Sequence, residues 1–446
     1  MQISSRQIKL KRSRLINLQL YDSLSKQLKR IELDKDNLVK IYLCGPTVYD
    51  DIHIGNIAPV IIFDYLIRYL KEKQLNVLYV HNITDIDDKI VNKAQQLGVE
   101  ESEIANIYAE KYFELLKKLN VIWPTHTPKV SEHIEDIQNT IEQLMNKGYA
   151  EINEAGDVVF KLDLIPTYGE LSKQNLNELT NISDFCLWKK IQFGKTWDSK
   201  WGKGRPGWHT ECFTFIDKLC CQKVHIHGGG IDLKFPHHEN ENAHCRALYN
   251  TPLADIWIHI GHLSTPDGKI SKSQNKKFLL KDVVDSYSPN LLRLFFLKNS
   301  YSTPSLVSYE ILDDLNEELN SFLVAINKAI SAIYIADNKY DLDSSTEINS
   351  EFLSFLENNL NLPSVLTWLQ QLKKTLLTSI KNKQISEIKT HLSELKTHLE
   401  WLGFQIPNEH TPENLELLTT WKTHIEKQEW KSADEIRDKL IKLKLI

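Results

Sequence analysis

The stretch NLVKIYLCGPTVYDDIHIGNIAPVIIFDYLIRYLKEKQLNVLYVH, residues 37–81, decides the fold of this chain. Residues 37–44 are largely apolar and end at a Gly-Pro pair, which predicts a buried strand. Apolar residues then recur at helical spacing over 56–73, and 76–81 read as a second strand. A strand, a helix and a strand in so short a stretch predict a βαβ unit in a parallel, doubly wound sheet. Ligands of such sheets bind at the carboxyl ends of the strands, where Cys44 lies.

The composition is that of an ordinary globular chain. Its 446 residues are enough for two to four domains, and 41% are hydrophobic and 25% charged. The net charge of −5 does not exclude an RNA partner, because local basic patches supply that attraction. Six cysteines are too few for a dense disulfide framework, so they are expected to be core residues, metal ligands or nucleophiles.

The basic N-terminal residues and the distribution of apolar residues indicate where in the cell the protein is expected. No apolar run reaches the roughly 18 residues that would span a bilayer. The first 14 residues are basic and no signal-type apolar stretch follows them. We therefore expect a cytoplasmic protein without a membrane segment. An organellar transit peptide is the alternative, since this arm is rich in Ser and free of acidic residues.

The first short motif is HIGN at residues 53–56, the histidine motif, between a predicted strand end and a predicted helix start. A glycine here allows a nucleotide to approach the backbone closely, and a helix N-terminus favours phosphate. His53 and Asn56 can donate hydrogen bonds to phosphate oxygens as charge shifts during a transfer. The plainer interpretation is a turn glycine with a capping asparagine.

The second short motif is KISKS at residues 269–273, the lysine motif. Two lysines three positions apart, separated by small polar residues, suit a loop that closes on a polyphosphate. The alternative is a solvated basic loop. Together and in this order, the two motifs resemble the HIGH and KMSKS signatures of class I aminoacyl-tRNA synthetases. Asn56 stands in place of His and still donates hydrogen bonds, and Ile270 stands in place of Met and stays apolar. Residues 274–276 replace the usual Leu-Gly-Asn.

Five longer segments resemble the cysteinyl-tRNA synthetase family in particular. They are YLCGPTVYD at 42–50, NITDIDDK at 82–89, DFCLWK at 184–189, GRPGWHTEC at 204–212 and HGGGIDLKFPHHENE at 227–241. The resemblance runs from about residue 18 to 300 and continues more loosely through the tail. Segments of this length and order are highly specific.

The resemblance implies a zinc site. In that family two Cys, one His and one Glu hold the ion, and these roles fall on Cys44, Cys212, His237 and Glu241. Zinc accepts S, N and O donors, and the family's substrate thiol binds it as thiolate. Serine has a harder and far less acidic oxygen, so no editing domain is needed to reject it.

Spacing by itself favours a different cluster of metal ligands, Cys220, Cys221, His225 and His227. We reject it because adjacent cysteines rarely reach one metal ion. Cys186, Cys220, Cys221 and Cys245 are read as partly buried thiols.

The resemblance also implies substrate contacts. Thr84, Trp208, His227 and Asp232 match positions of the amino-acid pocket, although Trp208 could be a core residue and Asp232 a helix cap. ATP, with Mg²⁺, would be bound by His53, Gly55, Asn56, Lys269 and Lys272, and all of these except Gly55 would stabilise charge as pyrophosphate leaves.

The expected fold is a Rossmann-like catalytic domain with a connective insertion, then an all-α bundle and a small anticodon-binding segment. The boundaries are a basic extension at 1–17, the catalytic domain's first half at 18–122, the connective insertion at 123–205, the second half with the zinc site at 206–262, the lysine-motif and stem-contact region at 263–314, the helical bundle at 315–405 and the terminal segment at 406–446.

The terminal segment carries aromatic and basic groups suited to RNA, namely Trp421, Trp430, Lys431, Arg437, Lys439, Lys442 and Lys444. A plain helical surface is the alternative for each of them. The sequence stops at Ile446, about a dozen residues before the Gly-Thr-x-Trp ending usual in the family.

The resulting hypothesis is a monomeric enzyme that activates L-cysteine with ATP and transfers it to tRNA-Cys. One rival is a related ligase that joins activated cysteine to a small-molecule amine. The other is a non-catalytic zinc- and nucleotide-binding paralogue. The terminal segment favours tRNA over the first rival, and the motif lysines and four metal positions argue against the second.

Overall fold

The computed structural model of this chain describes residues 14–33, 36–173, 184–191, 193–266, 268–269, 278–337, 339 and 346–446. By its internal packing the chain divides into two compact units. The first unit comprises Met1–Tyr49, Leu70–Asn106 and Pro124–His259. The second unit comprises Asp50–Tyr69, Ile107–Trp123 and Ile260–Ile446.

A four-stranded sheet with the order β10-β9-β3-β4 lies at the centre of the first unit. Its strands are β3 (Leu38–Leu43), β4 (Asn76–His81), β9 (Val224–Gly230) and β10 (Ala254–Ile260). β3 pairs in parallel with both β4 and β9, so that Leu43 lies opposite His81 and Gly228. Helix α1 (Ile54–Glu72) connects β3 to β4 in the chain. The predicted βαβ unit and parallel sheet are confirmed, and the segments that follow Leu43 and His81 leave the sheet at one edge.

Helices of the first unit begin and end at recognisable signals. They are α2 (Asp88–Leu97), α4 (Ile134–Asn146), α5 (Trp208–Cys220) and α6 (Glu239–Tyr249). Asp87 caps α2 by accepting a hydrogen bond from the Lys89 N–H, and Gly98 ends it with a left-handed φ of 67°. The buried core of this unit joins the sheet to α4, α5 and α6, with Tyr42, Phe213 and Trp257 among its members.

The helical stretch that begins at α2 is interrupted between α3 (Glu101–Lys118) and α4. Pro124 and Pro128 lie in this gap and cannot donate backbone hydrogen bonds to a helix. The chain instead runs beside β4 and beyond it, with hydrogen bonds from His81 N to His126 O at 3.0 Å and from Ile83 N to Pro128 O at 2.9 Å. A 3-10 turn, η1 (Val130–Glu132), leads into α4.

Two antiparallel sheets complete the first unit. β1 (Arg14–Asp22) and β2 (Gln27–Leu33) form a hairpin. The second sheet has the order β5-β6-β7-β8, with β5 (Ala150–Ile152), β6 (Val158–Phe160), β7 (Phe185–Lys190) and β8 (Gly204–Pro206). Neither sheet was identified from the sequence. Their strands are short or follow turn-rich sequence, so their periodicity is weak.

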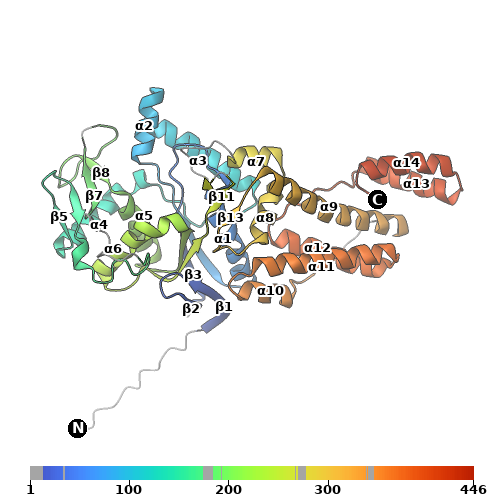
Figure 1. Cartoon of the computed structure of the whole chain (residues 1–446), viewed down its shortest axis with the longest axis horizontal. Coiled ribbons are helices and arrows are strands. Elements are labelled where there is room, and N and C mark those ends of the chain that lie inside the picture. The colour runs from blue at the N-terminus through green and yellow to red at the C-terminus, as the bar shows by residue number, and fades with distance from the viewer. Residues whose placement is uncertain are drawn as a thin grey trace, which may run out of the picture. The chain divides into compact units, whose positions relative to one another are not determined.

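The second unit is mostly helical. Its small sheet contains β11 (Leu263–Thr265), β12 (Gly268–Lys269) and β13 (Ser305–Leu306). Its helices are α7 (Leu280–Ser286), α8 (Pro289–Lys298), α9 (Tyr309–Asp337), α10 (Ser350–Glu357), α11 (Leu362–Lys381), α12 (Ile385–Trp401), α13 (Pro412–Glu426) and α14 (Trp430–Lys442). Helices α9, α11 and α12 pack against one another, and α13 and α14 form a terminal hairpin (Figure 1). The predicted α/β body followed by a helical region is confirmed.

Helix α9 is the one helix of the described residues that is long and apolar enough to cross a membrane. Its most apolar 18-residue window has a mean hydropathy of 1.4, and half of that window is buried inside the protein. Over the whole helix, the buried residues include Leu312, Leu315, Leu319 and Phe322, which recur at helical spacing. Because α11 and α12 pack on α9, this pattern is typical of a core helix in a bundle.

Candidate functional site

Four side chains from four separate segments converge in the first unit. Cys44 follows β3, Cys212 lies on α5, His237 lies in the short turn η4 (Lys234–His238), and Glu241 lies on α6. One ligand atom from each lies within 4.8 Å of all the others. The His237 Nε2–Glu241 Oε1 distance is 2.6 Å, and Cys44 Sγ lies 3.5 Å from the same oxygen. These residues could hold a metal ion, and we call them the metal cluster.

A second group of potential ligands overlaps the metal cluster. It keeps Cys44 and Glu241 and adds His227 and His238. His227 Nε2 lies 2.5 Å from Glu241 Oε2, and His238 Nε2 lies 3.4 Å from Cys44 Sγ. His238 is not among the site residues predicted from the sequence, although it is the neighbour of the predicted ligand His237. Both sets offer three sulfur or nitrogen donors and one carboxylate oxygen, and zinc accepts all of these donor types.

The four side chains of the metal cluster differ in how readily they lose their protons. Burial disfavours a Cys212 thiolate, but the Cys44 thiol and His237 beside it lower the Cys212 pKa to about 6. Burial and the neighbouring Cys212 raise the pKa of Cys44. Burial also opposes ionisation of Glu241, yet His237 and His227 hold the pKa of that carboxyl well below its usual range. Burial lowers the pKa of His237, but Glu241 and Cys212 raise it to about 10, so a cation would have to displace protons from His237 and Cys44 while Cys212 and Glu241 supply negative charge.

Asn82 lies beside the metal cluster and connects it to the sheet. Its Oδ1 accepts hydrogen bonds from Tyr42 Oη at 3.0 Å and from the Gly45 N–H at 2.9 Å, and it lies 3.8 Å from Cys212 Sγ. Its Nδ2 donates to Thr84 Oγ1 at 3.2 Å. A Cβ on Gly45 would lie 1.6 Å from the Asn82 carbonyl oxygen, so only glycine fits there. The turn after Cys44 is thus fixed against the end of β4.

Aromatic rings form one wall of the metal cluster. The Trp208 indole stacks on the His237 ring with a centroid distance of 4.5 Å and remains 39% exposed. The His227 ring stacks in the same way on Trp257, at 4.5 Å. Of the four predicted substrate contacts, Thr84 and His227 are buried beside the metal cluster and Trp208 flanks it. Asp232 is exposed, in the short helix η3 (Ile231–Leu233).

The cysteines favoured by spacing alone do not belong to this cluster. Cys220 is buried and Cys221 is exposed, and neither is part of a potential metal group in the described residues. His225 Nδ1 instead accepts a hydrogen bond from the Lys40 N–H at 2.9 Å.

The histidine motif lies in the second unit, at the first turn of α1. Asn56 Oδ1 accepts a hydrogen bond from the His53 N–H at 3.2 Å, and His53 Nδ1 accepts one from the Gly55 N–H at 3.1 Å. A Cβ on Gly55 would lie 3.0 Å from the His53 ring, so the glycine lets that ring fold over the helix start. The asparagine therefore caps the helix start from within α1, by a bond back to the residue before the helix, and not as the N-cap residue.

The segment that follows the lysine motif, at Phe278 and Leu279, contacts the histidine motif through the backbone. His53 forms a β-bridge with Leu279, and the Ile54 N–H donates to Phe278 O at 3.1 Å. Lys269 ends β12, which pairs with β11. The Lys269 side chain and Lys272 lie outside the described residues. The described contact of the histidine motif with this region is therefore that of Phe278 and Leu279, in the second unit.

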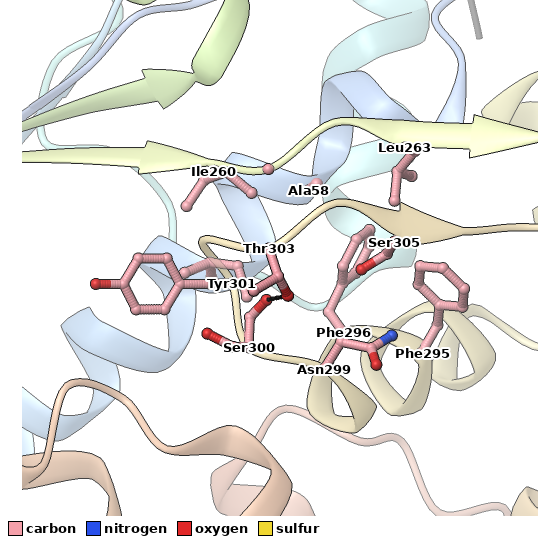
Figure 2. A pocket seen from close by; sticks show the side chains of 12 residues that line it. Ala58, Ile260, Leu263, Phe295, Phe296, Asn299, Ser300, Tyr301, Thr303 and Ser305 are labelled. Carbon is pink, nitrogen blue, oxygen red and sulfur yellow. Dashed lines mark hydrogen bonds between the residues drawn. The ribbon is translucent and has the colours of Figure 1, made fainter. Parts of the chain in front are cut away.

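A small cavity in the second unit is too small for a substrate. It is lined by residues of α1, α8 and the segments around Gly261 and Thr303, among them Ala58, Ile260, Leu263, Phe296 and Tyr301 (Figure 2). Its volume of about 10 Å³ is roughly that needed for one water molecule.

Comparison with known proteins places this fold and site in a class. The family model "tRNA synthetases class I (C) catalytic domain" matches residues 30–316. A solved methionyl-tRNA synthetase from Mycobacterium tuberculosis has a similar fold, with a TM-score of 0.60 at 11% identity over 90% of this chain and 93% of that chain. The fold is that of a class I tRNA synthetase.

Sequence relatives define the family more closely. A cysteine–tRNA ligase from Malacoplasma penetrans is 40% identical over 96% of this chain and 100% of its own length. One from Ureaplasma parvum is 39% identical over 96% of this chain and 100% of its length. The chain therefore belongs to the cysteine–tRNA ligase family, and the family predicted from its sequence motifs is confirmed.

Proposed function

We propose that this chain binds L-cysteine, ATP and tRNA-Cys, forms cysteinyl-adenylate and transfers the cysteinyl group to the 3′ end of the tRNA. Membership of the cysteine–tRNA ligase family supports this reaction. The observation that carries the choice of amino acid is the metal cluster, whose two thiols, imidazole and carboxylate lie within 4.8 Å of one another. A soft metal in such a site selects a substrate thiol over a hydroxyl.

The proposed metal is one zinc ion per chain, held by Cys44, Cys212, His237 and Glu241. These residues fit zinc because their donors are S, S, N and O and because the Cys212 pKa of about 6 favours a thiolate at neutral pH. When bound, zinc would supply a Lewis acid for the substrate thiolate. His227 would hold Glu241 in place through their 2.5 Å contact, as an outer partner of a metal ligand does.

Activation would depend on positioning and electrostatics. The cysteine carboxylate would attack the α-phosphate of ATP, and pyrophosphate would leave. His53, Asn56, Lys269 and Lys272 would stabilise the developing charge, with Mg²⁺ accompanying ATP and Gly55 leaving room for the nucleotide. The turn that holds His53 and Asn56 together supports this role, since their hydrogen bonds preorganise the start of α1.

The hairpin α13–α14 is the proposed anticodon-binding element. Trp430 is 61% exposed there, beside Lys431, and such a ring can stack on a base while lysines contact phosphates. Trp421 instead packs partly against the small core of the hairpin. We further propose that the protein is a cytoplasmic monomer.

The experiment that tests the function is cysteine-dependent ATP–pyrophosphate exchange, run beside charging of a tRNA-Cys transcript and with serine as the control. Exchange and charging with cysteine only are the expected results. Exchange without charging would favour a ligase that acts on a small-molecule amine. Absence of exchange from zinc-loaded protein would contradict the proposed function and leave a binding module.

A further inference from the structure

A recess in the first unit lies beside the metal cluster and has no role in the reaction described so far. It has a volume of about 120 Å³. Its lining comes from the loop before α2, from β7 and from the start of α5, and includes Asp87, Asp88, Lys189, Arg205, Trp208 and Glu211. This volume is well below the roughly 300 Å³ of sites for drug-sized ligands, so the recess suits a small polar group and not a nucleoside.

Most charges around this recess already have partners. Asp88 pairs with Lys189 at 3.1 Å and contacts Arg205, and Asp87 accepts the capping hydrogen bond from the Lys89 N–H at 2.8 Å. Glu211 differs, because its side chain is 1% exposed and its Oε2 has no hydrogen-bond partner among the described residues. Arg205 Nη1 also lacks a partner there. A buried carboxyl oxygen without a donor is costly unless a ligand supplies one.

A chain of hydrogen bonds runs from Gly45 through Asn82 to Thr84, on the side of Glu211. The Gly45 N–H can only donate, so the Asn82 atom that receives it at 2.9 Å must be the amide oxygen. Asn82 Nδ2 therefore faces Thr84 and donates to its Oγ1 at 3.2 Å. Burial raises the pKa of Glu211, and the Thr84 hydroxyl, which is then free to donate toward this carboxyl, opposes that rise. Glu211 Oε2 keeps acceptor capacity for a further donor.

The recess and the metal cluster share a wall. Glu211 immediately precedes the cluster residue Cys212 on α5. The Trp208 ring lines the recess and stacks on the His237 ring, with a centroid distance of 4.5 Å. Two carbon atoms separate the sulfur of cysteine from its nitrogen. A cysteine whose sulfur lies at the metal cluster would therefore reach this wall with its amino group.

We propose that Glu211, whose buried Oε2 faces this recess without a partner among the described residues, binds the α-ammonium group of the amino-acid substrate. This inference rests on the proposed function and names the residue that recognises the ammonium end of cysteine. An ammonium group supplies the missing donor for Oε2 and a counter-charge for a buried carboxylate. A thiol without an amino group would bind the metal but would make no contact with Glu211.

The test compares three thiols on zinc-loaded protein by isothermal titration calorimetry and by steady-state exchange. Cysteine has the ammonium and carboxylate groups, cysteamine has only the ammonium group, and 3-mercaptopropionate has only the carboxylate. The substitution Glu211→Gln should raise the Kd of cysteamine and the KM for cysteine by about 10- to 100-fold, the worth of a charge-assisted hydrogen bond. The Kd of 3-mercaptopropionate should not change.

The matched control is Glu142→Gln, the same chemical change at a surface carboxylate that pairs with Lys200 at 2.6 Å. It should leave all three constants unchanged. Equal weakening of the three thiols in Glu211→Gln, or no weakening at all, would overturn the assignment while leaving the proposed function intact. Absence of exchange in the unaltered protein would instead remove the proposed function, whereas the calorimetric comparison would still decide the ammonium contact.

If Glu211→Gln does not fold, a crystal structure of the unaltered protein with cysteine decides the matter. The expected result places the substrate nitrogen within about 3 Å of Glu211 Oε2, the length of a charge-assisted hydrogen bond. A nitrogen bound elsewhere, with the Glu211 oxygen satisfied by water, would refute the assignment.

Discussion

Glu241 in the first unit and Arg293 in the second are both buried charges, but their partners differ in kind. Glu241 is surrounded by groups that can gain or lose protons, namely His227, His237 and Cys44. Arg293 is 1% exposed, and four of its five hydrogen bonds go to backbone carbonyls, with Asp64 as the remaining partner. Titratable partners can exchange protons for a metal ion, whereas backbone carbonyls cannot leave. The first arrangement is suited to a ligand and the second to stability.

The largest expected effect comes from breaking the metal cluster. Cys212→Ser removes a thiolate, and we expect bound zinc and cysteine-dependent exchange to be lost while the fold remains. Zinc content by mass spectrometry and the exchange rate check this. Cys245→Ser is the control, because that buried thiol contacts Gln222 O at 3.8 Å and belongs to no potential metal group in the described part of the chain. Near-normal exchange by metal-free Cys212→Ser would refute the zinc assignment.

Breaking the Arg293 network should affect stability without affecting the metal. Arg293→Met leaves the Asp64 carboxylate and the Leu119 and Leu402 carbonyls short of donors, which should lower the unfolding free energy by about 3–5 kcal/mol. Urea denaturation checks the loss, and zinc content should stay constant. Arg437→Met, which breaks an exposed pair with a 3.9 Å contact, should cost less than about 1 kcal/mol. Loss of zinc in Arg293→Met would contradict the view that Arg293 serves stability and not the metal cluster.

The buried base His81 should make the free energy of unfolding depend on pH. Burial lowers the pKa of His81 from 6.5 to about 4, against the opposing effect of its hydrogen bond to Leu43 O at 2.9 Å. The unfolded chain therefore binds more protons between these values, and stability falls as pH decreases through this window. From pH 7 to pH 5 this histidine should cost about 2 kcal/mol of unfolding free energy. His81→Gln should show a shallower decline in urea denaturation, and an unchanged slope would contradict the assignment.

The smallest expected effect concerns the edge of the Arg293 network. The Tyr65 hydroxyl is buried and donates to Arg293 O at 2.9 Å. Tyr65→Phe removes this hydrogen bond but leaves the guanidinium contacts, so the unfolding free energy should fall by about 1 kcal/mol. Thermal denaturation beside Arg293→Met measures the difference. A loss as large as that of Arg293→Met would mean that the backbone of α8, and not the guanidinium, holds the network.

Sequence spacing accounts for one contact of the metal cluster but not for the others. His237 and Glu241 are four positions apart, and their contact of 2.6 Å follows the expectation that such residues share a face. Cys44 and Cys212 are far apart in sequence, and only resemblance to a family joined them. His238 and Asn82 were not identified as site residues, because a histidine beside another histidine and an asparagine after a strand carry no spacing signal. The predicted domain boundaries and the roles of Lys269 and Lys272 stay predictions.

The sequence by itself determined the βαβ unit, the helical last third and the family, because periodicity and long motifs are local properties of the chain. Only the tertiary structure decided which donors meet at Glu241, and that Oε2 of Glu211 has no partner among the residues that the structure describes. The parallel strands β3, β4 and β9 bring the turn after Cys44, the Asn82–Thr84 segment and the residues after Gly228 to one edge of the sheet. That meeting depends on strand order and register, which arise from long-range pairing and are not written in any short stretch of residues.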